Sequence, residues 1–143
     1  MSNLAWSIPI VIMMLFSIIS IFITLFARIH ALRQGRISLA SFKTMDFCKK
    51  ANPWLEVSSR HLDNLFQTPV LFYVSFLIIM NSPALSQIRY FLILGWLFVI
   101  FKIFNSIIHL TCNNLVLRLM TFLIANACLF TLVVMLLVDT IKR

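Results

Sequence analysis

Four long apolar runs dominate the sequence and limit what it can fold into. They cover about residues 8–27, 65–80, 90–108 and 117–138. About 20 apolar residues in a helix cross the roughly 30 Å hydrocarbon core of a bilayer. A water-soluble domain of 143 residues, 62% of them hydrophobic, could not bury so much apolar surface. The sequence therefore predicts an all-α integral membrane protein, a four-helix bundle that forms one domain over residues 1–143.

Positive charge concentrates between the first two apolar runs. Residues 28–64 hold seven Lys and Arg residues, against at most two in any other loop or end. Such loops lie in the cytoplasm, so we expect residues 28–64 there and both termini on the opposite side. The net charge of +8 thus reflects membrane topology and not nucleic-acid binding. Asn52 and Pro53 are typical of a helix start, which would extend the second helix into the cytoplasm from residue 53.

Two predicted helices carry polar residues along one face. The third helix has such residues at the spacing i, i+3, i+4, i+7, namely Lys102, Asn105, Ser106 and His109. The second has them at i, i+4, i+8, i+11, namely Glu56, Arg60, Asn64 and Gln67. Ionisable residues in a membrane usually face a cavity or the bundle interior. The two stripes therefore predict a ligand site near the cytoplasmic boundary, and hydrogen bonding between helices is the alternative.

The residues of this expected site are mostly cationic. Arg60, Lys102 and Arg118 favour an anionic ligand, because cations bind carboxylates through charge-assisted hydrogen bonds. The three cysteines lack the spacing of a disulfide framework or a zinc site, so no metal site is expected.

Other polar residues are expected to have structural or solvated positions. We expect Ser17, Ser20, Thr24 and Asn126 to form hydrogen bonds between helices. His30 and His61 lie close to the expected membrane boundary, and we expect both to be solvated.

The segment from Arg60 to Pro69 resembles the second-helix signature of the MAPEG family (membrane-associated proteins in eicosanoid and glutathione metabolism). That signature runs Arg-x-x-x-Asn-x-x-Glu and is followed shortly by Pro. The stretch from Lys102 to Asn113, followed by Arg118, looks like the third-helix pattern of bacterial members. The four spans, the length and the basic first loop are also similar, so the resemblance covers essentially the whole chain.

The resemblance implies a homotrimer in a bacterial inner membrane, with glutathione as co-substrate bound between subunits near the cytoplasmic side. Arg118 is the catalytic candidate, as the residue that would stabilise the glutathione thiolate, and Arg28 is the second choice. A lipophilic electrophile would enter from the bilayer. By position, the candidate glutathione-binding residues are Arg60, Asn64, Gln67, Lys102, Asn105, His109 and Arg28.

Three positions depart from the family pattern. Gln67 stands where the family usually has an acid, so a contact to the amino group of glutathione loses its charge. Lys102 replaces an expected Arg and loses its bidentate geometry, and Cys112 stands where bacterial relatives often have Tyr. Two functions stay open. One is a glutathione-dependent transferase or peroxidase acting on lipophilic electrophiles, and the other is a non-catalytic MAPEG-fold protein that binds lipid or a protein partner.

Overall fold

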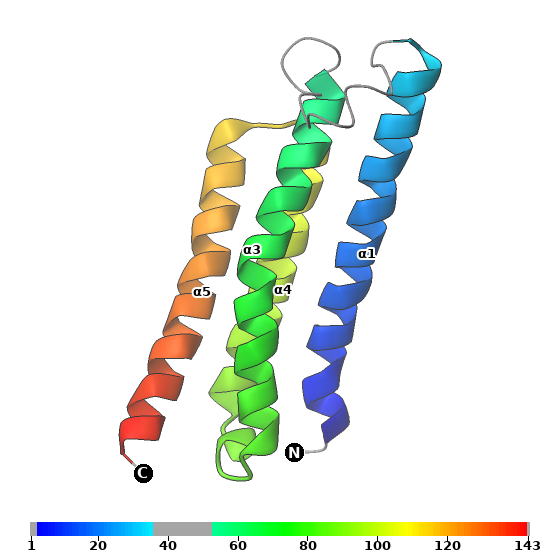
Figure 1. The fold of residues 1–143 in the computed structure, drawn as a ribbon. Helices are drawn as coiled ribbons and strands as arrows, with labels where there is room; N and C mark the ends of the chain where they lie inside the picture. Colours follow the sequence, from blue (N-terminus) through cyan, green and yellow to red (C-terminus); the bar gives the residue numbers. More distant parts are fainter. Residues whose placement is uncertain (1–2, 36–52, 143) are drawn as a thin grey trace.

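The computed structural model describes residues 3–35 and 53–142, and long helices make up most of this part of the chain (Figure 1). The elements in chain order are α1 (Asn3–Arg33), α3 (Pro53–Asn81), the short 3-10 helix η1 (Leu85–Gln87), α4 (Arg89–Leu110) and α5 (Leu115–Ile141). All four α-helices are long and apolar enough to cross a membrane. This confirms the prediction of an all-α, four-helix membrane fold. Most of the basic segment, residues 36–52, lies outside the described residues.

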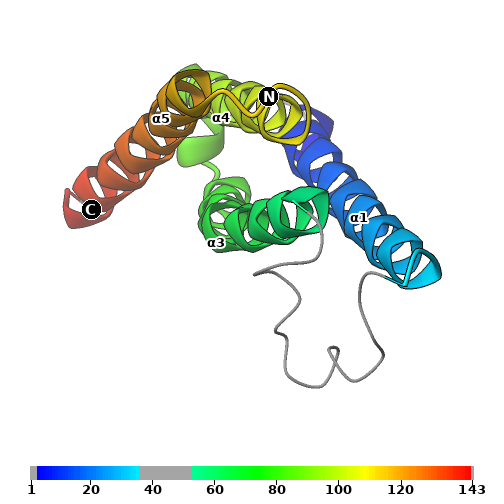
Figure 2. The ribbon, with the colours of Figure 1, turned by 90° about the horizontal axis from the view of Figure 1, so that it is seen from above.

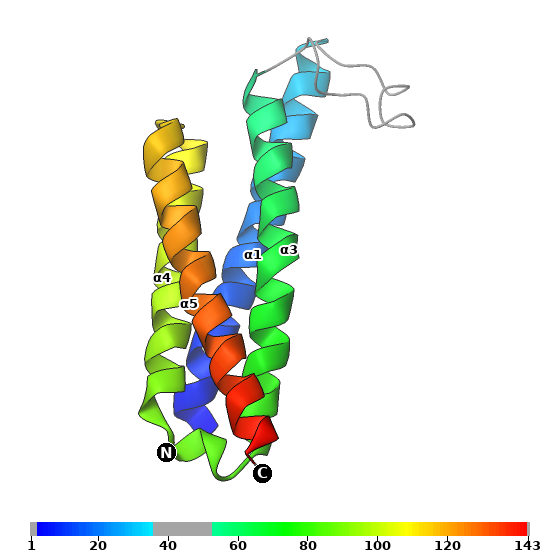
Figure 3. The same cartoon turned by 90° about the vertical axis from the view of Figure 1, so that its left-hand side faces the viewer.

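The helices run alternately in opposite directions, so α1 begins and α5 ends at the same end of the bundle (Figure 1). We call this end the terminal end, and the end with the α4–α5 turn (residues 111–114) the distal end. α4 packs along α5, and α1 packs along α3, with fewer contacts between the two pairs. Seen from the distal end, α5, α4 and α1 form an arc, and α3 lies on its concave side (Figure 2). In the side view the two pairs stand apart at the distal end and come together towards the terminal end (Figure 3).

Local sequence sets the ends of these helices. α3 starts at Pro53, where the missing N–H of proline is harmless. Gly35 follows α1 with a φ of 65°, a left-handed conformation that glycine adopts readily after a helix. The Asn114 side chain caps α5 by accepting hydrogen bonds from the backbone N–H groups of Val116 (3.0 Å) and Leu117 (3.2 Å).

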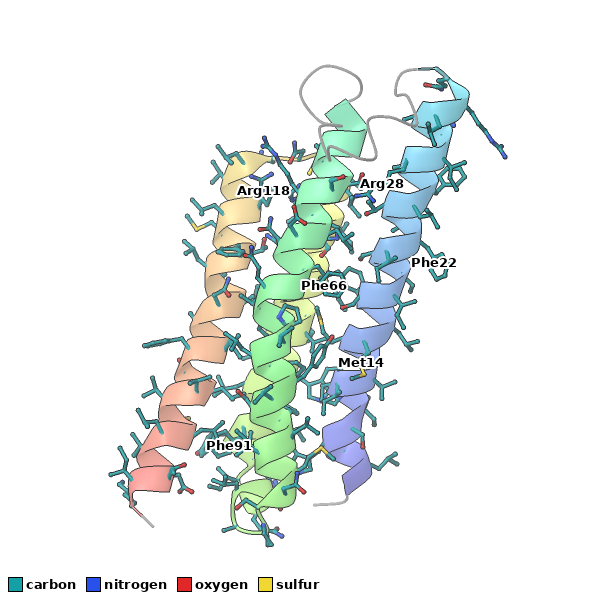
Figure 4. All side chains as sticks on the ribbon, viewed as in Figure 1. Met14, Phe22, Arg28, Phe66, Phe91 and Arg118 are labelled. Atoms are coloured by element: carbon teal, nitrogen blue, oxygen red, sulfur yellow. The ribbon has the colours of Figure 1, made fainter. Side chains whose placement is uncertain are left out.

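Aromatic side chains form the centre of the bundle. Phe72 on α3 lies 4.5 Å from Phe76 and 4.8 Å from Phe98 on α4, measured between ring centroids. Trp6 on α1 contacts Phe76 edge-on at 5.6 Å, and all four rings are fully buried. Such pairs add to the stability that burial alone provides. The outer helix faces carry exposed apolar residues, such as Phe22 on α1, that suit contact with lipid (Figure 4).

The hydroxyl groups of α1 differ in their hydrogen-bond partners. Ser20 donates to a carbonyl one turn earlier in its own helix (3.0 Å), so the expectation that it links helices is wrong. Thr24 bonds within α1 and also donates to the Ser58 carbonyl on α3 (3.2 Å). The Ser17 hydroxyl lies 3.4 Å from the Tyr73 hydroxyl. The link between α1 and α3 therefore uses two of the three expected residues.

Gly95 on α4 provides a test of how closely α3 and α4 approach. A Cβ atom at this position would collide with the ring of the buried Phe76. We expect Gly95→Val to lower the free energy of unfolding by about 1–3 kcal/mol, the usual range for overpacking. Thermal unfolding in detergent would measure it. Ala127→Val, which adds methyl groups at an exposed position of α5, is the control; an equal loss in both variants would contradict the close approach.

Candidate functional site

A cavity of about 190 Å³ lies towards the distal end, between α3, α4 and α5. We call it the distal cavity. Its lining residues are Asn64, Asn105, Leu115, Arg118, Leu119 and Phe122. Each of the three helices contributes one polar side chain to it, and all three were candidates from the sequence. The structure therefore brings Asn64, Asn105 and Arg118 together.

Hydrogen bonds fix the α4 and α5 side of this cavity. Asn105 donates from Nδ2 to the Arg118 carbonyl (2.7 Å) and to the Thr121 hydroxyl (3.0 Å). Arg118 donates from Nη1 to the Asn113 side-chain oxygen (3.1 Å) in the α4–α5 turn. Asn113 has a φ of 45°, a left-handed conformation that asparagine tolerates better than most residues. The cap at Asn114 and these bonds together hold Arg118 at the first turn of α5.

Three basic side chains are buried beside this cavity. Lys102, His109 and His61 are each only 3% exposed, and the two imidazole rings lie 5.5 Å apart. The Lys102 ammonium lies 5.2 Å from the ring of Phe122 and 5.9 Å from that of Phe98. Both distances fit cation–π contacts. Because Phe122 also lines the distal cavity, Lys102 lies behind the cavity wall and not in it.

His61 is a buried residue near the distal cavity whose burial the sequence prediction missed. The expectation that it is solvated is wrong: it is buried between helices, and its Nε2 has no hydrogen-bond partner among the described residues. The position of His61 in the helical repeat of α3 could have predicted its burial. His61, Leu65 and Phe72 share the spacing i, i+4, i+11, which places all three on the inward face of α3. His30, by contrast, is exposed as expected.

The structure does not place every candidate in the distal cavity. Arg60 and Gln67 are exposed on α3 outside its lining. Arg60 lies one helical turn before the cavity residue Asn64 on α3, so it is close to the cavity. Arg28 is half-buried on α1 and does not line the cavity (Figure 4). The side chain of Glu56 lies outside the described part of the chain.

Cys112 is exposed in the α4–α5 turn, at the same end as the distal cavity. A hydrogen bond with the backbone of Asn114 lowers the pKa of its thiol. A thiol with a lowered pKa is more often present as the reactive thiolate, so Cys112 is an accessible and reactive group near the site.

Comparison with known proteins identifies the family. The model of the MAPEG family matches residues 5–138. The chain belongs to the MAPEG family. This confirms the resemblance inferred from the two helix motifs, and the family includes glutathione transferases and peroxidases as well as non-catalytic members. No curated protein and no solved structure matches the chain.

Asn105 provides a test of how the distal cavity is built. Its amide joins α4 to α5, whereas the Asn126 amide donates to a carbonyl of its own helix (2.7 Å) and does not link helices as expected. Hydrogen bonds between membrane helices contribute on average about 0.6 kcal/mol each. We therefore expect Asn105→Ala to lower the free energy of unfolding by about 1 kcal/mol. Asn126→Ala, the matched control, should lose less in the same denaturation assay, and a larger loss there would contradict this role.

Proposed function

We propose that this protein is a membrane-bound, glutathione-dependent transferase or peroxidase that acts on lipophilic electrophiles. The observation that carries the proposal is the convergence of Asn64, Asn105 and Arg118 on the distal cavity. Two amide side chains and a guanidinium suit a peptide ligand with carboxylate groups, which form strong hydrogen bonds with arginine. The buried Lys102 beside the cavity adds positive potential to the same region.

The distribution of acidic groups supports an anionic ligand. The described side chains include two carboxylates, Asp63 and Asp139. Asp63 is exposed on α3, and Asp139 is near the C-terminal end of α5, far from the distal cavity. The residues that line the distal cavity therefore include a guanidinium and no carboxylate, and glutathione would supply the negative charge.

We further propose that the protein is a homotrimer and that the site lies between subunits. Arg60, Asn64 and Gln67 form an exposed polar stripe on α3, a helix that can span the membrane. Such residues are costly against lipid, and a neighbouring subunit would cover them. Ligand pockets usually measure about 300–1,000 Å³. The 190 Å³ of the distal cavity in one chain is smaller, which fits a site that a second subunit completes.

The proposed chemistry starts from the glutathione thiol. Free thiols have a pKa of about 8.5, and a nearby Arg118 guanidinium would stabilise the thiolate. A reduction of two pKa units corresponds to about 2.7 kcal/mol. In conjugation, the thiolate sulfur would bond to an electrophilic carbon of a substrate that enters from lipid. Either a leaving group such as halide departs with the electrons of its bond, or a conjugated double bond opens and its other end takes up a proton. In hydroperoxide reduction, two glutathione molecules would give glutathione disulfide, an alcohol and water.

A non-catalytic role in binding lipid or a protein partner is the second candidate. It is favoured by the position of Lys102, which lies behind Phe122 and not in the cavity wall. Gln67 also lacks the charge of the family acid and does not line the cavity. Both departures affect groups that the family resemblance assigns to glutathione binding.

Arg118→Ala tests the proposed chemistry. Adding glutathione to the purified protein should produce thiolate absorbance in the near ultraviolet, and we expect this signal to fall on the order of tenfold in the variant, because the thiol pKa would rise by more than one unit. The bond from Asn105 goes to the Arg118 backbone carbonyl, so the fold should survive the change. Arg89→Ala at the terminal end is the matched control.

The same experiment separates the two candidate functions. If the parent protein shows neither thiolate absorbance nor glutathione affinity by calorimetry, while mass photometry reports an intact trimer, the enzyme proposal fails and the non-catalytic role is supported. If Arg89→Ala loses as much signal as Arg118→Ala, the assigned role of Arg118 is wrong.

We also propose a bacterial inner-membrane location with the distal end in the cytoplasm, which Cys112 can test. In a Cys48→Ser, Cys128→Ser background, Cys112 is the remaining thiol. A membrane-impermeant maleimide should label it in inside-out vesicles and not in intact spheroplasts. Its lowered pKa should place half-maximal labelling below the pH of an ordinary thiol. Labelling in spheroplasts would reverse the orientation.

A further inference from the structure

A second cavity lies at the terminal end of the bundle, where α4 begins and α5 ends. Its volume is about 230 Å³, and we call it the terminal cavity. Phe91 on α4 and Val134, Met135 and Val138 on α5 form its apolar walls. Figure 4 shows Phe91 in the half of the bundle that ends at the two termini. None of the residues assigned to the glutathione site lines it, so it is independent of the proposed function.

The terminal cavity also has charged groups of both signs in its lining. Asp139 and Lys142 are three residues apart at the end of α5, which places both on the same side of the helix. Asp139 is half-buried and Lys142 is exposed. Arg89 at the start of α4 is exposed nearby in the chain, next to Ile88, which lines the cavity. The apolar part of the terminal cavity thus lies next to the acidic Asp139 and the basic Lys142.

The two helix ends at this cavity have opposite partial charges. The start of a helix attracts anions, and its end attracts cations. The Ile88 cap of α4 supplies no side-chain hydrogen bond to the first turn, while the last turn of α5 contains Asp139. The α4 side of the cavity mouth therefore favours an anionic group, and the Asp139 side favours a cationic one.

We propose that the terminal cavity binds a phospholipid whose zwitterionic headgroup carries a primary amine, such as phosphatidylethanolamine. An acyl chain would lie against Phe91 and Val134. The phosphate would lie near Lys142 and the start of α4, and the ammonium would donate to Asp139. An ionised carboxylate has about four acceptor positions, so Asp139 can accept this donor in addition to its other interactions. The trimethylammonium of a choline headgroup has no N–H to donate.

The position of the cavity along the bundle favours a lipid as its occupant. Lys and Arg near the ends of spanning helices, and tyrosine, typically lie at headgroup depth. Here Arg89, Tyr90 and Lys142 mark that depth at the ends of α4 and α5, and Tyr90 is 68% exposed. Val134 and Val138, the exposed part of the apolar wall, therefore face the hydrocarbon next to the headgroups. A phospholipid would place its acyl chain against them and its headgroup beside Asp139 and Lys142.

Native mass spectrometry of the full-length protein from mixed micelles would test the proposal. The micelles would contain equal amounts of phosphatidylethanolamine, phosphatidylcholine and phosphatidylglycerol. We expect bound phosphatidylethanolamine to exceed phosphatidylcholine by about tenfold, the effect of one charge-assisted hydrogen bond. Asp139→Asn should remove this preference. Asp63→Asn, which changes an exposed acid on α3 outside the cavity, should keep it.

A second variant tests the acyl-chain part of the site. Val134→Trp would fill the cavity and should reduce the binding of all three lipids, with unchanged thermal unfolding as proof that it folds. Equal binding of phosphatidylethanolamine and phosphatidylcholine by the parent would overturn the proposal. So would a preference that persists in Asp139→Asn, or stronger binding of phosphatidylglycerol, which would reflect attraction of an anionic lipid to Lys142 and Arg89 alone.

Discussion

Polar groups inside a bilayer need hydrogen-bond partners within the protein, because hydrocarbon offers none. Many hydroxyl side chains of the described helices form such a bond inside their own helix. Ser106 donates to the Lys102 carbonyl (2.9 Å), and Thr131 donates to the Ala127 carbonyl (2.9 Å), in each case one turn earlier. Such residues tolerate a membrane position without joining helices. The bundle depends instead on aromatic contacts and on the few polar groups that reach across.

The polar residues that cannot be satisfied in this way mark the functional region. Asn105 uses its amide to join α4 to α5, and Lys102 has two aromatic rings near its charge. Aromatic contacts offset only part of the cost of a buried ammonium. An anion in the distal cavity would offset more of it. Binding of the proposed anionic ligand would therefore stabilise the distal end through the buried Lys102.

The sequence predicted the fold and the polar helix faces, but it did not predict which side chains of a face line the distal cavity. The stripe from Lys102 to His109 is buried along its whole length, as its periodicity indicates. Periodicity assigns a face of a helix, however, and not the distance of a side chain from a cavity. Lys102 and Asn105 share a face, yet Phe122 from α5 separates the first from the cavity that the second lines. Phe122 belongs to another helix, so only the tertiary structure could reveal this.

The same limit explains His61 and the exposed stripe on α3. Residue type and a position near the membrane boundary predict that His61 is solvated. It is buried because it shares the inward face of α3 with Leu65. The stripe that contains Arg60 was identified correctly as one face, but a single chain leaves it exposed. A neighbouring molecule covers such a face, and the sequence of one helix does not identify that neighbour.

The distal cavity lies between the two pairs of helices. Asn64 belongs to the α1–α3 pair, whereas Asn105 and Arg118 belong to the α4–α5 pair. Phe72 and Phe98 join the two pairs through a ring contact at 4.8 Å. Phe72 is eight residues beyond Asn64 on α3, about 12 Å along the helix. A small change of angle at this aromatic contact would therefore move Asn64 relative to Arg118. The bonds of Asn105 join α4 to α5 on their side of the cavity, so the placement of the α1–α3 pair sets the distance from Asn64 to the Asn105 and Arg118 side.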